Sequence, residues 1–266
     1  MGDIATGLVN NSVKDKLKEN ELVLSMTVRL VRTAEIALIA KTAGFDSLYV
    51  DLEHSSFSIE TTSQICIAAL GQGITPFVRV PSVAPDYISR VLDGGALGVI
   101  APHIQSAEEA MAVVEAAKYP PLGTRSFTGG LPHIGFRSVS TEHLFEAMNA
   151  ATMVTVMIET AEALENVDAI AAVEGVDMLF VGANDLCASL GIVGQLQHDQ
   201  LKDAFARCQA ACDKHGKRLG VGGLSGSPEV LRELIRRGAR FISTGTDLSF
   251  LLSAAGEKAQ RSRALS

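Results

Sequence analysis

The residues most able to do chemistry follow one short segment. Ser47–Val50 is largely apolar and predicts a buried strand, and two carboxylates and an imidazole come directly after it. These are Asp51, Glu53 and His54. They cannot lie in an apolar core without partners, so we expect them where the strand meets a loop, which is where α/β proteins keep their chemistry. The alternative is a strand that simply stops and is followed by a solvated acidic turn.

Other predicted strands also end in charged residues. Arg79 ends the third strand, Glu159 follows the fifth, and Asp185 follows the sixth. If the strands are parallel, these residues converge on one rim with Asp51, where crowded carboxylates raise one another's pKa unless a cation joins them. Oxygen ligands without a thiolate favour a hard divalent ion, so we expect Mg²⁺ or Mn²⁺, with Co²⁺ as a further option.

Each of these residues also has a plainer interpretation. Glu159 could be a solvated carboxylate at the start of a helix, and Asp185 could cap a helix that begins at Leu186. Arg79 could be an ion-pair partner of a nearby carboxylate and no more, and His54 an ordinary surface histidine. For the remaining histidines the plain interpretation is favoured. They are His103, His133, His143, His198 and His215.

The apolar segments recur along the chain with helices between them. They are short and β-branched and do not alternate with polar residues, which is typical of parallel strands buried on both faces. We expect helices at about 33–43, 58–70, 84–93, 106–117 and 141–150. The expected strands are Val23–Val28, Ser47–Val50, Thr75–Val80, Ala96–Ile100, Met153–Ile158, Val176–Val181, Arg218–Val221 and Phe241–Thr244.

Eight such units predict one domain over residues 1–266, a (β/α)₈ TIM barrel with a lead-in helix in 1–20 and a C-terminal helix at about 246–264. Glycines such as Gly44 fall between a helix and the next strand, where a C-cap glycine belongs. An open doubly wound sheet is the alternative. It usually has a glycine-rich loop after the first strand, and Thr27–Leu30 is not one.

Composition argues against several classes of partner. The net charge of −7, with acidic and basic residues interspersed, disfavours nucleic acid, which requires a basic face. Met1–Lys18 has no apolar signal-peptide core, and no uncharged apolar run has membrane-spanning length. We therefore expect a soluble, cytoplasmic protein without a membrane partner. Its four cysteines lack zinc-site spacing and fit a reducing compartment. They are Cys66, Cys187, Cys208 and Cys212.

Several segments, in this order, resemble the class II, metal-dependent pyruvate aldolases of the 4-hydroxy-2-oxoheptanedioate (2,4-dihydroxyhept-2-enedioate) aldolase family. That family also includes 2-dehydro-3-deoxyglucarate aldolase and macrophomate synthase. The resemblance runs from about residue 20 to 255 and implies a barrel of the phosphoenolpyruvate/pyruvate type. The matching segments include Asp51-Leu52-Glu53-His54, Val78-Arg79-Val80-Pro81, Ile158-Glu159-Thr160, Val181–Leu186 and Gly245–Leu248.

The resemblance implies a role for each matching residue. Glu159 and Asp185 match the metal ligands, and His54 with Asp51 matches the base dyad. Arg79 matches the residue that contacts the keto or enolate oxygen of pyruvate. The backbone at Gly182 and Ala183 matches the loop that receives the pyruvate carboxylate, beside Asp185. Asp93 matches a carboxylate that reaches a neighbouring subunit's site, and the resemblance implies a hexamer, a trimer of dimers with exchanged C-terminal helices.

The chain departs from the family pattern at three places. Met157 stands where the family often has Gln, Asn184 interrupts its usual Gly-Pro-Ala-Asp-Leu, and Ser126 replaces a Gly. The last change falls in a long Gly- and Pro-rich segment, 119–137, and such loops are usually functional or disordered. We expect this segment to face the aldehyde. Its notable residues are Arg125, Phe127, Leu131, His133, Phe136 and Arg137.

The resemblance implies reversible cleavage of a 4-hydroxy-2-oxo acid to pyruvate, or a close analogue, and an aldehyde through an enolate at a divalent metal, and the residues agree with this chemistry. The reaction needs a base for the 4-hydroxyl and a cation that polarises the 2-oxo group. No lysine stands at a strand end, which disfavours a Schiff base. The alternatives are an oxaloacetate decarboxylase or citrate-lyase-like enzyme, a non-catalytic barrel, and a phosphate-binding barrel suggested by Gly222, Gly223 and Gly245.

Overall fold

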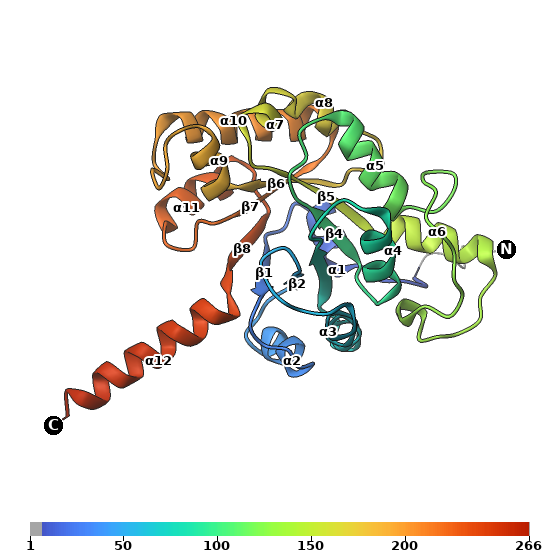
Figure 1. The fold of residues 1–266 in the computed structure, drawn as a ribbon, viewed down its shortest axis with the longest axis horizontal. Coiled ribbons are helices and arrows are strands. Elements are labelled where there is room, and N and C mark those ends of the chain that lie inside the picture. The colour runs from blue at the N-terminus through green and yellow to red at the C-terminus, as the bar shows by residue number, and fades with distance from the viewer. Residues whose placement is uncertain (1–6, 266) are drawn as a thin grey trace.

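The computed structural model describes residues 7–265, which form a closed barrel of strands surrounded by helices (Figure 1). All neighbouring strands are parallel, and β1 pairs with both β2 and β8, which confirms the predicted (β/α)₈ barrel. The strands are β1 (Val23–Val28), β2 (Ser47–Asp51), β3 (Thr75–Arg79), β4 (Gly98–Ala101), β5 (Met153–Ile158), β6 (Met178–Gly182), β7 (Arg218–Gly222) and β8 (Phe241–Thr246). The helices are α1 (Ser12–Lys18), α2 (Glu35–Thr42), α3 (Ile59–Gly71), α4 (Pro85–Asp93), α5 (Ala107–Ala117), the 3₁₀ turn η1 (Pro132–Ile134), α6 (Thr141–Ala151), α7 (Ala161–Glu165), α8 (Val167–Ala172), α9 (Ala183–Ser189), α10 (Asp199–His215), α11 (Pro228–Arg237) and α12 (Asp247–Arg263).

Large side chains fill the interior of the barrel. Tyr49, Phe77, Phe180 and Phe241 are buried there and pack edge to face, with ring centroids 5.6 to 6.4 Å apart. Glycine on a neighbouring strand makes room for them, since a Cβ at Gly98 would lie 2.4 Å from the Phe77 ring. The layer between strands and helices is built from Ala, Val, Ile and Leu, as a chain without tryptophan requires.

Helix α1 closes the end of the barrel where the strands begin. Its Val13 and Leu17 are buried against the interior cluster, and the Val13 backbone N–H donates to Thr75 at the start of β3. Asn11 caps the helix and also donates from its side chain to the Ala151 carbonyl at 2.7 Å. The opposite end therefore remains available for a site. Residues 1–6 of the expected lead-in helix lie outside the described residues.

The register of the strands brings the charged residues to that open end. Asp51 is the register partner of Arg79, and each ends its strand. Glu159 follows β5 directly. Helix α9 begins at Ala183, so Asp185 lies inside its first turn and does not cap a helix that starts at Leu186.

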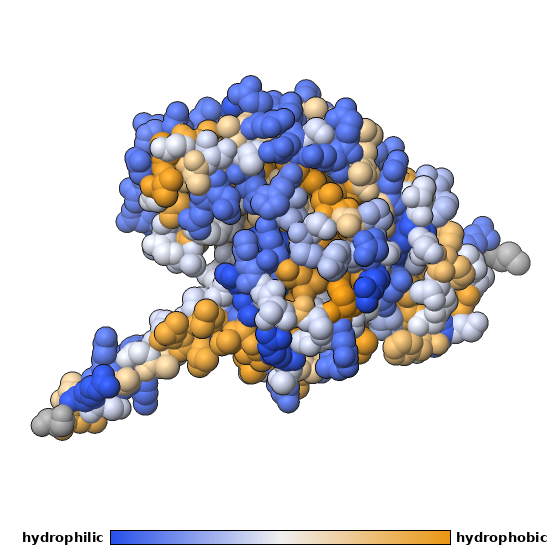
Figure 2. Space-filling view, in the orientation of Figure 1, coloured by the Kyte–Doolittle hydropathy of each residue, from blue (hydrophilic) through white to orange (hydrophobic). Residues whose placement is uncertain are grey.

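Two parts of the chain stand apart from the regular repeat. The segment 119–137 contains η1 and packs with α6, where Tyr119 stacks on Phe145 with ring centroids 4.4 Å apart. Helix α12 projects away from the barrel, and the part nearest the barrel is apolar on its visible face (Figures 1 and 2). Leu251 and Leu252 there are 58% and 65% exposed. Over residues 7–265, none of the helices combines the length and apolar character needed to cross a membrane.

Candidate active site

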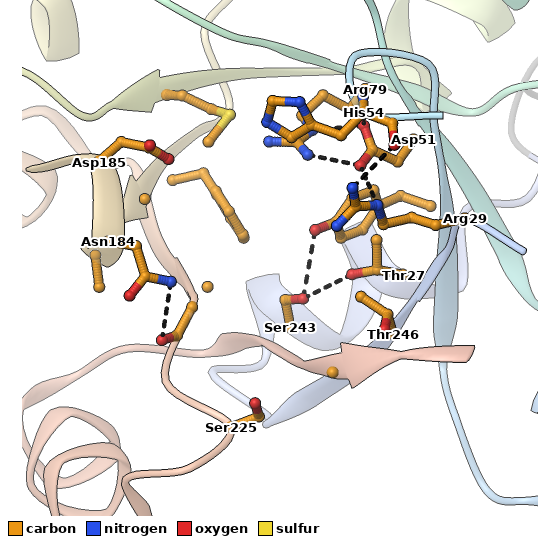
Figure 3. Close-up of a pocket in the computed structure, with 18 of the residues that line it drawn as sticks. Thr27, Arg29, Asp51, His54, Arg79, Asn184, Asp185, Ser225, Ser243 and Thr246 are labelled. Carbon is orange, nitrogen blue, oxygen red and sulfur yellow. Dashed lines mark hydrogen bonds and ion pairs between the residues drawn. The ribbon is translucent and has the colours of Figure 1, made fainter. Parts of the chain in front are cut away.

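A pocket of about 410 Å³ opens where the strands end (Figure 3). Its polar lining comes from β1, β2, β3, β6, β7 and β8 and the loops that follow them. Met157 and Phe180 contribute apolar surface to the pocket. Asp185 and Asn184 lie on one side of it, and Asp51, Arg79 and Arg29 on the other. Most of the charged residues expected to converge on one rim therefore do face one cavity.

The most buried polar contact in this pocket joins Asp51 to Arg79. Asp51 is fully buried, and the Arg79 Nε and Nη2 donate to its two carboxylate oxygens at 2.9 and 2.7 Å. Burial by itself raises the pKa of Asp51, but the hydrogen bonds and charge of Arg79, with help from the His54 backbone N–H and Arg29, hold it below its ordinary value. The same carboxylate raises the pKa of Arg79 despite the opposing effect of burial. Both groups are therefore charged, and the acidic stretch is not a solvated turn.

Glu53 and His54 leave the barrel in the order that the sequence suggests. The Glu53 carboxylate lies 2.9 Å from Arg79 Nη1, so one guanidinium joins two carboxylates. The imidazole of His54 is half exposed and lines the pocket. Asp51 accepts from the backbone N–H of His54 at 3.2 Å, whereas the imidazole is 3.8 Å from Glu53. The Asp51 carboxylate thus holds the backbone of His54. The contact between the Asp51 carboxylate and the His54 imidazole, which the resemblance implies, is not formed in this structure.

Glu159 is held by a residue that we did not assign to the site. It is 3% exposed, so it is not a solvated carboxylate. The backbone N–H of His103 donates to Glu159 Oε1 at 2.7 Å, and His103 Nδ1 lies 3.0 Å from the same oxygen. The other ring nitrogen of His103 lies 2.8 Å from Glu53. His103 has φ +58°, a left-handed conformation that is uncommon outside glycine.

The carboxylates near β5 and β6 fit a divalent cation. The pKa of Glu159 is raised, first by burial and then by the charges of Glu53 and Asp185, although His103 opposes the shift. Gly182 leaves room for the Glu159 carboxylate, because a Cβ there would lie 3.1 Å from Glu159 Oε2. Over residues 7–265, no three His, Cys, Asp or Glu side chains are already grouped as a metal site. Two carboxylates would leave coordination positions for water and substrate.

Asp93, expected at a neighbouring subunit's site, and the segment 119–137, expected to face the aldehyde, both lie away from this pocket. Asp93 ends α4 and pairs with Arg125 at 2.5 Å, and neither residue lines the cavity. No residue of 119–137 lines it within this chain. Phe136 is 65% exposed, and Leu131 is buried against α6. In the single chain this segment therefore does not face the cavity, contrary to our expectation.

The sequence analysis missed His103 and Arg29, which contact the carboxylates of the site. His103 follows β4, and its position at a strand end was the available signal, but lone histidines are usually unremarkable. Arg29 follows β1 and lies within 3.3 Å of Asp51. It falls at the end of the first strand, where we considered only a dinucleotide-binding loop.

A family model described as HpcH/HpaI aldolase/citrate lyase matches residues 29–254. The chain belongs to this family. It is an aldolase, a carbon–carbon lyase, as its named relatives are, which disfavours the non-catalytic barrel. Members of the HpcH/HpaI family depend on a divalent metal ion and act on small molecules, which agrees with the carboxylates described above.

Relatives with known names support this membership along the whole barrel. The chain is 40% identical over 250 residues to the 4-hydroxy-4-methyl-2-oxoglutarate aldolase of Hapsidospora irregularis, covering 93% of each chain. It is 35% identical over 212 residues to the 5-keto-4-deoxy-D-glucarate aldolase of Klebsiella pneumoniae, covering 80% of this chain and 81% of the other. The crystal structure of an HpcH/HpaI aldolase from Desulfitobacterium hafniense superposes with a TM-score of 0.88 at 30% identity, covering 93% and 95% of the two chains.

Proposed function

We propose that this HpcH/HpaI aldolase reversibly cleaves a 4-hydroxy-2-oxo acid to pyruvate, or a close analogue, and an aldehyde. The observation that carries the proposal is a cavity lined by the buried Arg79, the His54 imidazole and Asp185, with the buried Glu159 near enough for the charge of Asp185 to raise its pKa. This set supplies fixed positive charge, a proton acceptor and cation ligands. The substrates in the names of the relatives, both 2-oxo or keto acids, support it.

Glu159 and Asp185 are the proposed ligands of the divalent metal. Their oxygen donors suit Mg²⁺ or Mn²⁺, and Co²⁺ is a further option. When bound, the metal polarises the 2-oxo group of the substrate. Gly182 and Ala183 line the pocket beside Asp185, and their backbone is proposed to receive the pyruvate carboxylate. A side chain at either ligand position without a carboxylate would lose the cation.

Arg79 and His54 are proposed to carry the proton and charge changes. Arg79 is 11% exposed at its side chain and reaches the pocket, where its guanidinium donates to the 2-oxo oxygen as negative charge grows on it. His54 takes the proton of the 4-hydroxyl during cleavage and returns it during condensation. Asp51 fixes Arg79 by two hydrogen bonds and the His54 backbone by a third, so it acts by positioning both groups.

The decisive experiment is exchange of the pyruvate methyl protons for deuterium, followed by NMR in D₂O. We expect exchange by enzyme supplied with Mg²⁺ or Mn²⁺ and none by metal-stripped enzyme. Glu159→Gln should lose metal binding and with it the metal-dependent exchange. His54→Ala should slow turnover by roughly 10²- to 10⁴-fold. His143→Ala, on α6 and outside the pocket, is the matched histidine control. Metal-independent exchange, or full turnover by His54→Ala, would overturn the assignments.

The enzyme is also proposed to assemble as a hexamer, a trimer of dimers in which α12 is exchanged between subunits. The projection of α12 and the exposure of Leu251 and Leu252 support this (Figure 1). Asp93, which is 34% exposed at its side chain and does not line the pocket at the strand ends, is proposed to reach a neighbouring subunit's site. Light scattering should show smaller particles for a Leu251→Asp, Leu252→Asp double variant. An unchanged mass would contradict the exchange.

A reducing, cytoplasmic location is the last part of the proposal. All four cysteines have free thiols and are buried. Burial raises the pKa of the Cys66 and Cys212 thiols to about 12, so they remain protonated and unreactive. Nothing in the barrel therefore depends on an oxidising compartment. Fractionation of cells that express a tagged chain tests the location.

A further inference from the structure

The wall of the pocket opposite Asp185 is polar and carries one cation. Three strands and their following loops build this wall, β1, β7 and β8. Its side chains are hydroxyls and one guanidinium. The residues are Thr27, Arg29, Ser225, Ser243, Thr246 and Ser249. Such a surface favours a small hydrophilic group over an alkyl or aromatic one, because buried polar groups need hydrogen-bond partners.

The backbone of Arg29 is fixed by a buried carboxylate at the end of β8. Asp247 is 6% exposed and accepts hydrogen bonds from the backbone N–H groups of Arg29, Leu30 and Val31, at distances from 2.8 to 3.2 Å. These bonds join the loop after β1 to the start of α12. The backbone from which the Arg29 side chain starts is therefore held in place.

The side chain of Arg29 keeps donors that the protein does not use. Its Nη2 donates to the His54 carbonyl at 2.9 Å, and its Nε lies 3.3 Å from Asp51. Asp51 already receives two shorter hydrogen bonds from Arg79. Among residues 7–265, Nη1 of Arg29 has no hydrogen-bond partner, and the side chain is 39% exposed toward the cavity. A guanidinium with an unpartnered N–H group that faces a cavity can bind a carboxylate.

We propose that Arg29 binds a carboxylate on the carbonyl compound that is released by cleavage and consumed by condensation, so that this compound is itself a 2-oxo acid. The inference rests on the proposed function. The contact of Arg29 with the His54 backbone places such a carboxylate beside the base. In condensation the pyruvate methyl loses one proton, its carbon bonds to the carbonyl carbon of the second acid, and the former carbonyl oxygen gains a proton. The product is a 4-hydroxy-2-oxo acid with a second carboxylate on C4, and no other reactant is needed.

The test compares two acceptors of two carbons each, glyoxylate with a carboxylate and glycolaldehyde with a hydroxyl. Condensation with saturating pyruvate and Mg²⁺ gives kcat/KM for each acceptor with the wild-type enzyme, Arg29→Gln and Arg29→Lys. We expect Arg29→Gln to lower the glyoxylate-to-glycolaldehyde ratio by roughly 10- to 100-fold, chiefly through KM for glyoxylate. Arg29→Lys should restore part of the ratio. Because the ratio is taken within one protein, a general loss of activity cancels.

Arg32→Gln is the matched control. Arg32 lies on the same loop, contacts Ser56 and the Phe57 ring, and does not line the pocket. It should leave the ratio at the wild-type value. An equal loss for both acceptors in Arg29→Gln would overturn the proposal and make Arg29 a partner of Asp51 only. Deuterium exchange by the wild-type enzyme without an acceptor distinguishes failure of the proposed function from failure of the proposed role of Arg29. Absence of exchange rejects the proposed function. Exchange together with an unchanged glyoxylate-to-glycolaldehyde ratio in Arg29→Gln rejects only the role of Arg29.

Discussion

Among residues 7–265, the buried arginines Arg79 and Arg125 each pair with an aspartate, and only the pair of Arg79 opens into the pocket. Arg79 holds Asp51 with two hydrogen bonds at the ends of β3 and β2, and its guanidinium also reaches Glu53. Arg125 holds Asp93 at 2.5 Å, but its side chain is fully buried and its guanidinium lies over the Tyr119 ring, 4.6 Å from the centroid.

The difference lies in what each guanidinium faces. Arg79 has carboxylates on one side and the cavity on the other, so part of its charge is directed at a substrate. Arg125 is enclosed, and among the described residues its Nε and Nη1 have no hydrogen-bond partner. A buried ion pair adds little net stability, yet removal of one partner is costly. The same pair of residue types therefore serves chemistry at the strand ends and the packing of 119–137 away from them.

The largest expected effect is a loss of activity when the Arg79–Asp51 pair is changed. Arg79→Lys keeps the positive charge but cannot form the two-pronged contact with Asp51. We expect the rate of metal-dependent deuterium exchange to fall by roughly 10²- to 10³-fold, which is the usual loss when a donor to a developing oxyanion is removed. NMR of the pyruvate methyl measures it. A variant that exchanges at the wild-type rate would remove Arg79 from the reaction and leave the two pairs equivalent.

The next effect is a loss of stability when the Arg125–Asp93 pair is broken. Arg125→Met leaves Asp93 without its partner, and we expect the free energy of unfolding to fall by roughly 3 kcal/mol, the low end for a broken buried pair because Asp93 is partly solvated. Urea unfolding at fixed protein concentration measures the change. The exchange rate should fall less than about tenfold, since the pair lies outside the pocket. A stable variant without exchange would show instead that Asp93 works in a neighbouring subunit's site.

A third effect concerns the histidine that joins Glu53 to Glu159. His103→Asn tolerates the left-handed backbone and removes the imidazole. We expect the affinity for Mg²⁺ or Mn²⁺ to weaken by roughly 10- to 100-fold, as is typical when a group that orients a metal ligand is lost. Calorimetric titration of metal-stripped enzyme measures it, with His143→Asn as the control. Unchanged affinity would mean that His103 only fills space.

The sequence predicted the fold because the pattern of the strands is local. Parallel strands buried on both faces must be continuously apolar, and their carboxyl ends in a barrel share one rim, so Asp51, Arg79 and Asp185 could be grouped before any coordinates were known. The environment of Glu159 could not be predicted, because it depends on the left-handed turn at His103.

The position of 119–137 could not be predicted either. Its arginines and histidine have the composition of a functional loop, and only tertiary packing shows where they point. Arg125 and His133 turn inward toward α4 and β4, where they meet Asp93 and the Ala96 carbonyl. Arg29 was missed for the related reason that its anchor, Asp247, lies 218 residues away in sequence. Contacts between distant segments carry the information that local pattern lacks.

The smallest effect tests how closed the region around Arg125 is. Burial lowers the pKa of His133 to about 4, helped by the charge of Arg125 and opposed by the Ala96 carbonyl, while an unfolded histidine titrates near 6.5. Between these values the unfolded state binds more protons than the folded state, so stability falls as the pH falls. From pH 7 to pH 5 we expect His133 to remove on the order of 1 to 2 kcal/mol of unfolding free energy. His133→Gln can still donate to Ala96 and cannot titrate, so its urea unfolding should depend less on pH over this range. Equal pH dependence in both proteins would show that water reaches His133 and that this region is more open than the contacts of Arg125 imply.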